Sequence, residues 1–485
     1  AGAEAAATKQ PWFWTDQFDR NIQMLGLIGP RDHVAHAGTP GTEPGAIYRT
    51  IDPATGKLTG VVAFSDPKAI RAARSELTQS GPFDLAAAGA TLIDGNNDTD
   101  ISLEDSDMNA NPPLSLTKRY LWPEEGLRRI PDWVYTDQTI YEREIDKIFH
   151  GRTWNYVALE CEVPNPGDFI RSNVGPTPVV VSRAEDGSIN VFENRCAHRA
   201  AEFCRDLSGN AKEFVCPYHQ WSYDLKGNLA GVPFRRGVNG KGGMPSDFKN
   251  ANHGLRKLAV TTHRGVVFAS YRDDMESLQD YLGPEILEEF EATFDGRKLK
   301  LLGYYRHTLP GNWKLYMENV KDTYHASLLH LFFTTFRINR LSQKGGVIVG
   351  GDGGCHVSYT VSDGTATRDY EKAGMRSASG GFSLEAPHIL DSVDEIGDGV
   401  TLQIVGVFPG FVLQQIKNCL AVRRVIPRGV DSTELVWTAF GYADDTPERT
   451  ALRLGQANLI GPAGFISMED GAATGFVQRG VAGAG

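Results

Sequence analysis

The sequence predicts an α+β protein of several domains in which antiparallel sheets supply most of the framework. Short apolar runs, separated by proline, glycine and Asp-Gly pairs, pass through 155–270 and are typical of strands joined by tight turns. From about 277 onward, helical patterns alternate with longer strand patterns such as 400–407 and 435–442. The chain has 485 residues, of which 41% are hydrophobic, so it can bury more than one core.

The first element, within 8–90, is predicted to be a hairpin followed by a helix. Apolar runs at 47–51 and 61–64 flank the turn-forming sequence DPATG. Asp66-Pro67 then starts a helix with a repeating apolar face. These features predict a small α+β domain.

A linker and a helical segment follow this domain. Residues 91–117 read as a solvated linker, because 94–107 is rich in acidic residues and Pro112-Pro113 comes next. Residues 118–154 are predicted to be helical, with a helix over 137–149 that turns Ile140, Ile145, Ile148 and Phe149 inward.

Cys196-Ala-His198 and Cys216-Pro-Tyr-His219 are the strongest chemical signal in the sequence. Two thiols and two imidazoles from two short loops suit a [2Fe–2S] cluster with cysteines on one iron and histidines on the other. A four-ligand zinc site would use the same residue types. The Cys-then-His order is the same in both half-motifs and favours the cluster, which would accept and relay single electrons.

Asp322, His325 and His330 form a second candidate metal group. Two histidines and one carboxylate bind non-haem Fe(II) and leave positions open for oxygen and substrate. His325 and His330 would lie about 140° apart around an ideal helix. They can converge on one metal only if the helix widens or ends between them. Alone, this spacing is equally typical of solvated or hydrogen-bonded histidines.

In this order the two motifs resemble the large (α) subunits of Rieske-type ring-hydroxylating oxygenases, over residues 118–485. The resemblance implies an antiparallel β Rieske domain at 155–272 and a catalytic domain at 273–485. It also implies a helix-grip fold for the catalytic domain, in which a curved antiparallel sheet surrounds a long helix.

The same resemblance assigns roles to the motif residues. The cluster ligands would be Cys196, His198, Cys216 and His219, and the mononuclear iron would be held by His325 and His330. Asp322 would not bind the iron but would link an iron histidine to His219 of the partner subunit.

The third iron ligand of the family is a carboxylate late in the chain. Asp470, which precedes Gly471, is the best match, and Glu469 is the alternative if the register differs by one. This acidic pair could equally cap the start of a helix at Gly471.

The segments 304–349, 408–418 and 457–484 resemble the salicylate 5-hydroxylase branch of the family, which converts salicylate to gentisate. Related dioxygenases of anthranilate, halobenzoate or salicylate, the last giving catechol, share much of this pattern. A Rieske electron carrier without oxygenase activity is an alternative of another class. Candidates for binding the substrate carboxylate are Arg337, Asn339, Arg340, Gln343, Gln403 and Gln414.

Partners follow from the resemblance. Electrons would come from NADH through a ferredoxin reductase and a ferredoxin, and the α subunits would form a trimer, with small β subunits as α3β3. Residues 8–90 resemble the C-terminal domain of FAD-dependent ferredoxin reductases, either as a natural fusion or as a join between neighbouring genes. Relatives continue beyond Gly485, so we expect the catalytic domain to be truncated at its C-terminus.

The charge balance excludes some partners. A net charge of −11 argues against nucleic acids and anionic membranes. No apolar run reaches the length of a membrane span, and the first residues do not form a secretory signal. Beyond Cys196 and Cys216, the scattered cysteines read as reduced thiols, so a cytoplasmic location is expected.

Overall fold

The computed structural model describes residues 12–17, 20–26, 33–37, 47–51, 55, 57–64, 91–92, 120–340, 343–350, 354–361, 384–461 and 464–483. The chain divides into two compact units, Ala1–Pro113 and Leu114–Gly485. None of the helices in the described ranges combines the length and the apolar character that a bilayer crossing requires.

The first unit contains an antiparallel sheet in the order β1-β2-β5-β4-β3-β6. Its strands are β1 (Trp12–Gln17), β2 (Arg20–Gly26), β3 (His33–Ala37), β4 (Ile47–Ile51), β5 (Leu58–Phe64) and β6 (Thr91–Leu92). The predicted hairpin is confirmed as the β4–β5 pair. Thr91 and Leu92 were assigned to the linker by their sequence, but they pair with β3 and belong to this sheet. The helix predicted from Asp66-Pro67 and the rest of the linker lie outside the described residues.

The second unit opens with helical turns. They are η1 (Gly126–Arg128), α3 (Trp133–Thr136), α4 (Gln138–Glu144) and the π-helical turn η2 (Ile145–Phe149). Asp137 caps α4, since its carboxylate accepts a hydrogen bond from the Ile140 N–H at 3.0 Å. The predicted helix over 137–149 is therefore confirmed, and Phe149 is buried in the core.

Short strands then build the Rieske region from three small antiparallel sheets among the described residues, in the orders β10-β9-β8-β11, β12-β13-β14 and β15-β16-β7. The elements are β7 (Asn155–Leu159), η3 (Glu160–Glu162), β8 (Asp168–Val174), β9 (Thr177–Arg183), β10 (Ile189–Glu193), β11 (Ser208–Asn210), β12 (Phe214–Val215), β13 (Ser222–Tyr223), β14 (Leu229–Gly231), η4 (Asn250–Asn252), β15 (Ala259–His263) and β16 (Val266–Ser270). Phe192, Phe203 and Phe214 pack with Cys196 and Cys216 in one apolar cluster.

The catalytic region contains a long antiparallel sheet in the order β17-β23-β22-β21-β20-β19-β18. Its strands are β17 (Leu299–Leu309), β18 (Lys344–Val349), β19 (His356–Val361), β20 (Val400–Val407), β21 (Phe411–Ile416), β22 (Cys419–Gly429) and β23 (Ser432–Tyr442). The helices are α5 (Leu278–Leu282), α6 (Pro284–Thr293), α7 (Trp313–Asn319), α8 (Thr323–Leu329), α9 (Leu331–Thr335), η5 (Pro387–Leu390), α11 (Pro447–Ile460) and α12 (Phe465–Gly483).

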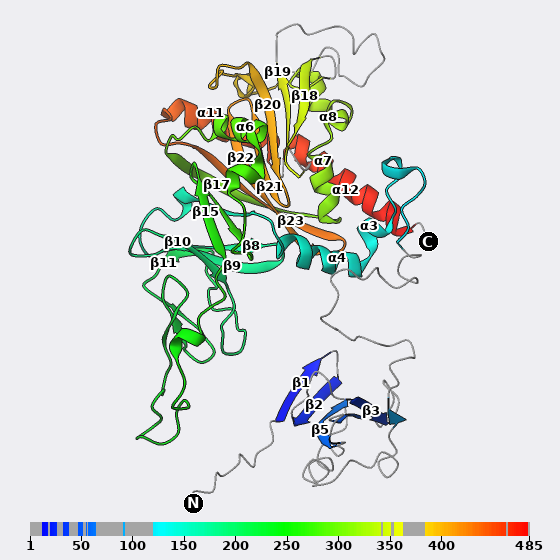
Figure 1. Ribbon diagram of the computed structural model, residues 1–485. Helices are drawn as coiled ribbons and strands as arrows, with labels where there is room; N and C mark the ends of the chain where they lie inside the picture. The colour runs from blue at the N-terminus through cyan, green and yellow to red at the C-terminus, as the bar shows by residue number, and fades with distance from the viewer. Residues whose placement is uncertain are drawn as a thin grey trace, which may run out of the picture. The chain divides into compact units, whose positions relative to one another are not determined.

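The two faces of this sheet pack against different elements. Leu413, Val422 and Phe440 point to one face, where they join a core with side chains of α5, α6 and β16. Val412 and Trp437 point to the other face and pack with residues of α7. Figure 1 shows α7, α8 and α12 beside the sheet, and α12 contacts α7 and β17. The expected α+β fold with antiparallel sheets is thus confirmed, and the second face is where the candidate iron residues gather.

Candidate functional site

The two Cys/His motifs form turns of the same shape. In each turn the cysteine N–H donates to the carbonyl of the residue after the loop, at 2.9 Å for Cys196 and 2.8 Å for Cys216. Each cysteine carbonyl accepts in return from the N–H of Ala200 (2.8 Å) or Gln220 (2.9 Å). Ala200 and Gln220 have φ of 58° and 57°, in the left-handed region. The two loops can therefore present their side chains as a matched pair.

The matched turns place like residues side by side. The Cys216 thiol is hydrogen-bonded with Cys196, and both side chains are buried. The rings of His198 and His219 lie 4.5 Å apart, centroid to centroid. The Tyr223 hydroxyl lies 3.1 Å from the Cys196 sulfur. A cysteine pair beside a histidine pair fits a [2Fe–2S] cluster whose two irons have different ligands.

The zinc alternative fits this geometry poorly. Zinc–ligand bonds of about 2.0–2.3 Å in a tetrahedral site would bring all four ligand atoms within about 4 Å of one another. Among the described residues, the one group of three or more such ligand atoms that lie within 4.8 Å of one another is His325, His330 and Asp470, and it contains none of the four motif residues. Cys204 stands apart, with its sulfur 3.7 Å from the carbonyl of Asp206, and burial raises the pKa of its thiol to about 11.

A break in the helices positions the second candidate group. Helix α7 ends at Asn319, and α8 begins after Asp322, whose carboxylate accepts from the N–H groups of Tyr324 (2.8 Å) and His325 (3.2 Å). Helix α8 ends at Leu329, so His330 lies between α8 and α9. The predicted helix end between the two histidines is therefore confirmed.

His325, His330 and Asp470 converge from α8, the α8–α9 junction and α12. One oxygen of Asp470 lies 3.4 Å from His325 Nε2 and 3.2 Å from His330 Nε2. The three ligand atoms all lie within 4.8 Å of one another. Asn319 also approaches, since its amide nitrogen lies 3.2 Å from Asp470 Oδ1. Two imidazoles and one carboxylate around one point match the facial ligand set of non-haem iron.

The electrostatics of this group suit a cation. Burial alone would raise the pKa of Asp470, but hydrogen bonds with His325 and His330 outweigh it and hold that pKa well below its usual value. Burial lowers the pKa of His330, yet Asp470 and Glu469 together raise it above the ordinary value. An ionised carboxylate between two imidazoles is therefore the resting arrangement of this site.

The two other carboxylates near the site face the far nitrogens of the histidines. Glu469 Oε2 lies 2.9 Å from His330 Nδ1, and Asp322 Oδ2 lies 3.4 Å from His325 Nδ1, a distance for an ion pair rather than a hydrogen bond. Glu469 and Asp470 are successive residues inside α12, which begins at Phe465. The interpretation of this pair as a helix cap at Gly471 was therefore wrong. Asp470, rather than Glu469, faces both histidines.

The pocket lined by His325, His330 and Asp470, termed the metal pocket below, lies against the sheet. Of the residues proposed to bind a substrate carboxylate, Asn339 and Gln414 line it. The others are committed elsewhere: Arg340 donates to the Thr334 carbonyl, Gln343 to that of Arg337, and Gln403 to Glu289, while Arg337 is not part of the lining.

Arg423, which the sequence reasoning did not select, also lines the metal pocket. The sequence gives little indication that Arg423 is buried, because two adjacent arginines, as in AVRRV, are usually solvated. The alternation of strand β22 could have revealed it, since an arginine at a core-facing position of a buried strand is unusual.

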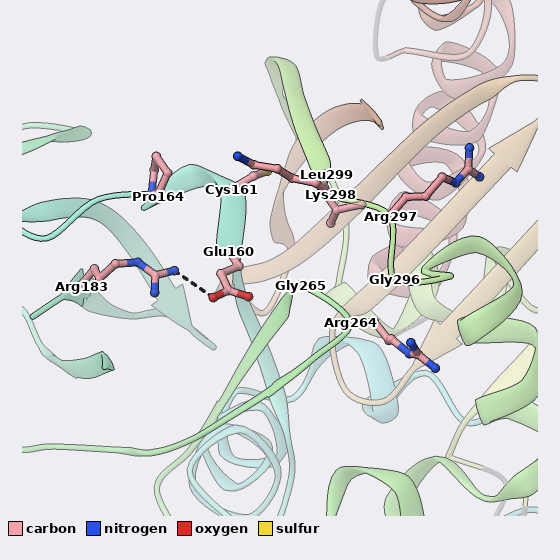
Figure 2. A pocket seen from close by; sticks show the side chains of 10 residues that line it. All are labelled: Glu160, Cys161, Pro164, Arg183, Arg264, Gly265, Gly296, Arg297, Lys298 and Leu299. Carbon is pink, nitrogen blue, oxygen red and sulfur yellow. Dashed lines mark hydrogen bonds and ion pairs between the residues drawn. The ribbon is translucent and has the colours of Figure 1, made fainter. Parts of the chain in front are cut away.

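A larger cavity of about 390 Å³ lies elsewhere in the second unit, near η3, the end of β9 and the start of β17. Figure 2 shows Arg183 pointing to Glu160, with which it forms a 3.0 Å ion pair. Arg264 and Arg297 are likewise paired with Glu291 and Asp295. None of its lining residues belongs to either candidate iron group, so the chemistry is expected in the metal pocket.

Comparisons with known proteins agree with this geometry. The chain matches the family of Rieske [2Fe-2S] domains over residues 153–241 and the ring hydroxylating alpha subunit (catalytic domain) family over 297–485. Residues 12–94 match the reductase C-terminal family. The naphthalene 1,2-dioxygenase from Rhodococcus sp. shares the fold, with a TM-score of 0.61 and 23% identity over 73% of this chain and 82% of that chain.

Several curated relatives are similar over most of their length. The terephthalate 1,2-dioxygenase terminal oxygenase component subunit alpha 2 of Comamonas sp is 54% identical over 73% of this chain and 86% of the relative. The anthranilate 1,2-dioxygenase large subunit of Burkholderia cepacia is 51% identical over 74% and 85%. The salicylate 5-hydroxylase large oxygenase component of Ralstonia sp is 47% identical over 74% and 86%. The chain therefore belongs to the family of aromatic ring-hydroxylating oxygenase α subunits, whose cofactors are a Rieske [2Fe–2S] cluster and a mononuclear iron.

Proposed function

We propose that this α subunit hydroxylates an aromatic acid, with the conversion of salicylate to gentisate as the leading reaction. The convergence of His325, His330 and Asp470 in one pocket is the observation that supports catalysis at this place. The names of three relatives at 47–54% identity contain terephthalate, anthranilate or salicylate, and each of these is an aromatic carboxylic acid.

The proposed iron ligands are Nε2 of His325, Nε2 of His330 and Oδ1 of Asp470. When bound there, ferrous iron supplies the activation of oxygen, because three protein ligands leave coordination positions open. Asp470 supplies a negative charge, and the buried walls of the pocket exclude water and orient the ring.

The proposed ligands of the cluster are Cys196, His198, Cys216 and His219. Asp322 is proposed to link His325 to His219 of the partner subunit, and its half-exposed carboxylate supports this role. This arrangement requires the trimer that the sequence analysis expects, with ferredoxin, ferredoxin reductase and small β subunits as partners. The match of residues 12–94 to reductase C-terminal domains supports a reductase in the same electron chain.

A second candidate reaction is the dioxygenation of terephthalate or anthranilate. Identity to the relatives with these names, 54% and 51%, exceeds the 47% to the salicylate 5-hydroxylase component. The alternative of a Rieske carrier without oxygenase activity was wrong, because residues 297–485 match the catalytic domain.

A single-turnover experiment tests the proposal. Iron-loaded protein is reduced and mixed with oxygen and, in separate reactions, with salicylate, anthranilate or terephthalate, and the product is identified by chromatography and mass spectrometry. Gentisate is the expected product. A diol formed from terephthalate, or catechol formed from anthranilate, would move the reaction to the second candidate. The absence of product from every acid, despite full iron content, would contradict the proposal.

The variant His325→Ala provides the control for the two iron sites. Because His325 belongs to the group with His330 and Asp470 and is not one of the proposed cluster ligands, we expect the Rieske absorption spectrum to remain and turnover to disappear. Loss of the Rieske spectrum as well would contradict the division into two sites.

A further inference from the structure

One face of the sheet forms the wall of the metal pocket. In the β21–β22 ladder, Arg423 lies opposite Val412 and Gln414 lies opposite Ala421. Directly opposite residues share a face, and side chains alternate along each strand, so Arg423 and Gln414 are diagonal neighbours on the same face. Both line the metal pocket.

Arg423 is a buried cation whose partners are neutral. Its side chain is 4% exposed. One terminal nitrogen donates to the Tyr316 hydroxyl, and the guanidinium lies 4.2 Å from the centre of the Trp437 ring. Its Nε has no hydrogen-bond partner, and no carboxylate of the described residues lies within ion-pair distance of it. A buried charge without a direct ion-pair partner is costly, so this guanidinium is suited to receive an anion.

Other buried arginines of the catalytic sheet show what a committed arginine looks like. Arg453 is 1% exposed and forms ion pairs of 2.7 Å with both Glu395 and Asp445. Arg424, the next residue along β22, points to the opposite face and donates to the Val157 carbonyl at 2.8 Å. Arg423 differs from both, because it is the one of these three that lines the metal pocket.

We infer that Arg423 binds a carboxylate group of the substrate and thereby restricts the enzyme to aromatic acids. The planar fork of a guanidinium can donate two parallel hydrogen bonds to one carboxylate. Gln414 adds a second polar group beside it, since its amide oxygen is buried without a partner. The inference rests on the proposed function, which places the aromatic acid in this pocket.

Equilibrium binding tests this role without turnover. Iron-loaded, oxidised protein is titrated by calorimetry, in the absence of reductant, with benzoate and salicylate and with the neutral amides benzamide and salicylamide. We expect the wild type to bind each acid about tenfold or more tightly than its amide, because hydrogen bonds to a charged carboxylate are stronger than those to a neutral amide. In Arg423→Gln this preference should fall to within about twofold, and Arg423→Lys should restore part of it.

The matched control uses two neighbouring glutamines of β21. Gln414→Ala should weaken acid binding several-fold, whereas Gln415→Ala, on the opposite face, should not change it. Iron content and the Rieske spectrum, measured on every variant, separate a local effect from misfolding.

Two results would overturn the inference. The first is a wild-type protein that binds benzamide as tightly as benzoate. This result needs no variant, so it decides the question even if Arg423→Gln does not fold. The second is an unchanged acid preference in a folded Arg423→Gln variant. If acids bind through Arg423 but single turnover yields no hydroxylated product, the proposed function fails and the inference stands. If the protein hydroxylates aromatic acids and neutral rings alike, without a preference for acids, the inference fails and hydroxylation at this site stands.

Discussion

Asp322 combines two physical tasks in one side chain. One carboxylate oxygen caps α8 by accepting from the N–H groups of Tyr324 and His325. The other oxygen lies 3.4 Å from His325 Nδ1. Capping needs only a hydrogen-bond acceptor, whereas the interaction with an imidazole, or with a cation on it, depends on charge. Substitutions can therefore separate the two tasks.

Asp322→Asn and Asp322→Ala should differ in stability but agree in activity. Asparagine caps helices about as well as aspartate, so we expect the asparagine variant to keep the wild-type stability and the alanine variant to lose about 1 kcal/mol. Both should bind iron normally and lose electron transfer to the mononuclear site. The measurements are urea unfolding and the rate of cluster reoxidation in a single turnover. A normal rate of cluster reoxidation in Asp322→Asn would contradict the proposed role of Asp322 in electron transfer.

Glu469 is expected to orient His330 rather than bind the iron. A carboxylate on the far nitrogen of a metal-binding histidine fixes its ring and tautomer, and losing such a partner typically costs about 10–100-fold in metal affinity. In Glu469→Gln we expect iron to be released at a chelator concentration about tenfold lower. The exposed neighbour Met468 provides the control as Met468→Gln, which should not change iron retention. Equal retention in both variants would argue against this role.

The candidate iron site could be predicted from the spacing of its histidines together with the family resemblance, and the substrate pocket could not. His325 and His330 are five residues apart, so they can converge only if the helix widens or ends between them, and the structure shows an end at Leu329. Asp470 could be proposed but not separated from Glu469, because the choice depends on which side of α12 faces the histidines. The alternation of β22 could mark Arg423 as facing a core, but its place beside Gln414 depends on the register of β22 against β21, which a single sequence does not contain.

At the scale of elements, β19 supports the break between α7 and α8. His356, on β19, is buried, and its Nε2 lies 3.3 Å from the Val320 carbonyl, which follows α7. Gly406 lies directly opposite on β20, where a Cβ atom would come within 2.1 Å of the His356 ring. The glycine thus makes room for a ring that holds the loop leading to Asp322.

The buried ring predicts a pH dependence of stability. Burial lowers the pKa of His356 to about 4, whereas its unfolded value is near 6.5. As pH falls below about 6.5 the unfolded state takes up the proton first, so stability is lost progressively down to about pH 4, by up to roughly 3 kcal/mol. Urea unfolding at pH 7.5 and pH 5 should show a smaller loss for His356→Gln than for the wild type. Parallel losses in both proteins would contradict this assignment.

At the scale of the whole molecule, the chain consists of two units that share no sheet. The resemblance over 118–485 was sufficient to predict the Rieske and catalytic folds, because each motif is typical of the fold in which the family carries it. The end of the first unit was harder to predict. Thr91 and Leu92 are separated from their sheet neighbours by a long stretch of sequence, and a two-residue strand has no periodicity to detect. The other domain boundaries stay predictions.

The division into units predicts that the oxygenase part folds by itself. A protein of residues 114–485 should retain the Rieske spectrum, the full iron content and the thermal stability of the longer chain, because the contacts divide at Pro113. Absorption spectroscopy, iron analysis and calorimetry on both lengths test this. A fragment that loses iron or unfolds early would show that the first unit supports the second.

The neighbouring arginines of β22 have a consequence for how this enzyme can change over generations. Arg423 faces the metal pocket, whereas Arg424 reaches the Rieske strands through Val157 and Ser172. Because a strand assigns alternate positions to separate faces, mutations at one set of positions can alter substrate preference while the other set preserves the seam between the domains. New catabolic activities, natural or engineered, should therefore arise first at the pocket-facing positions of β20, β21 and β22.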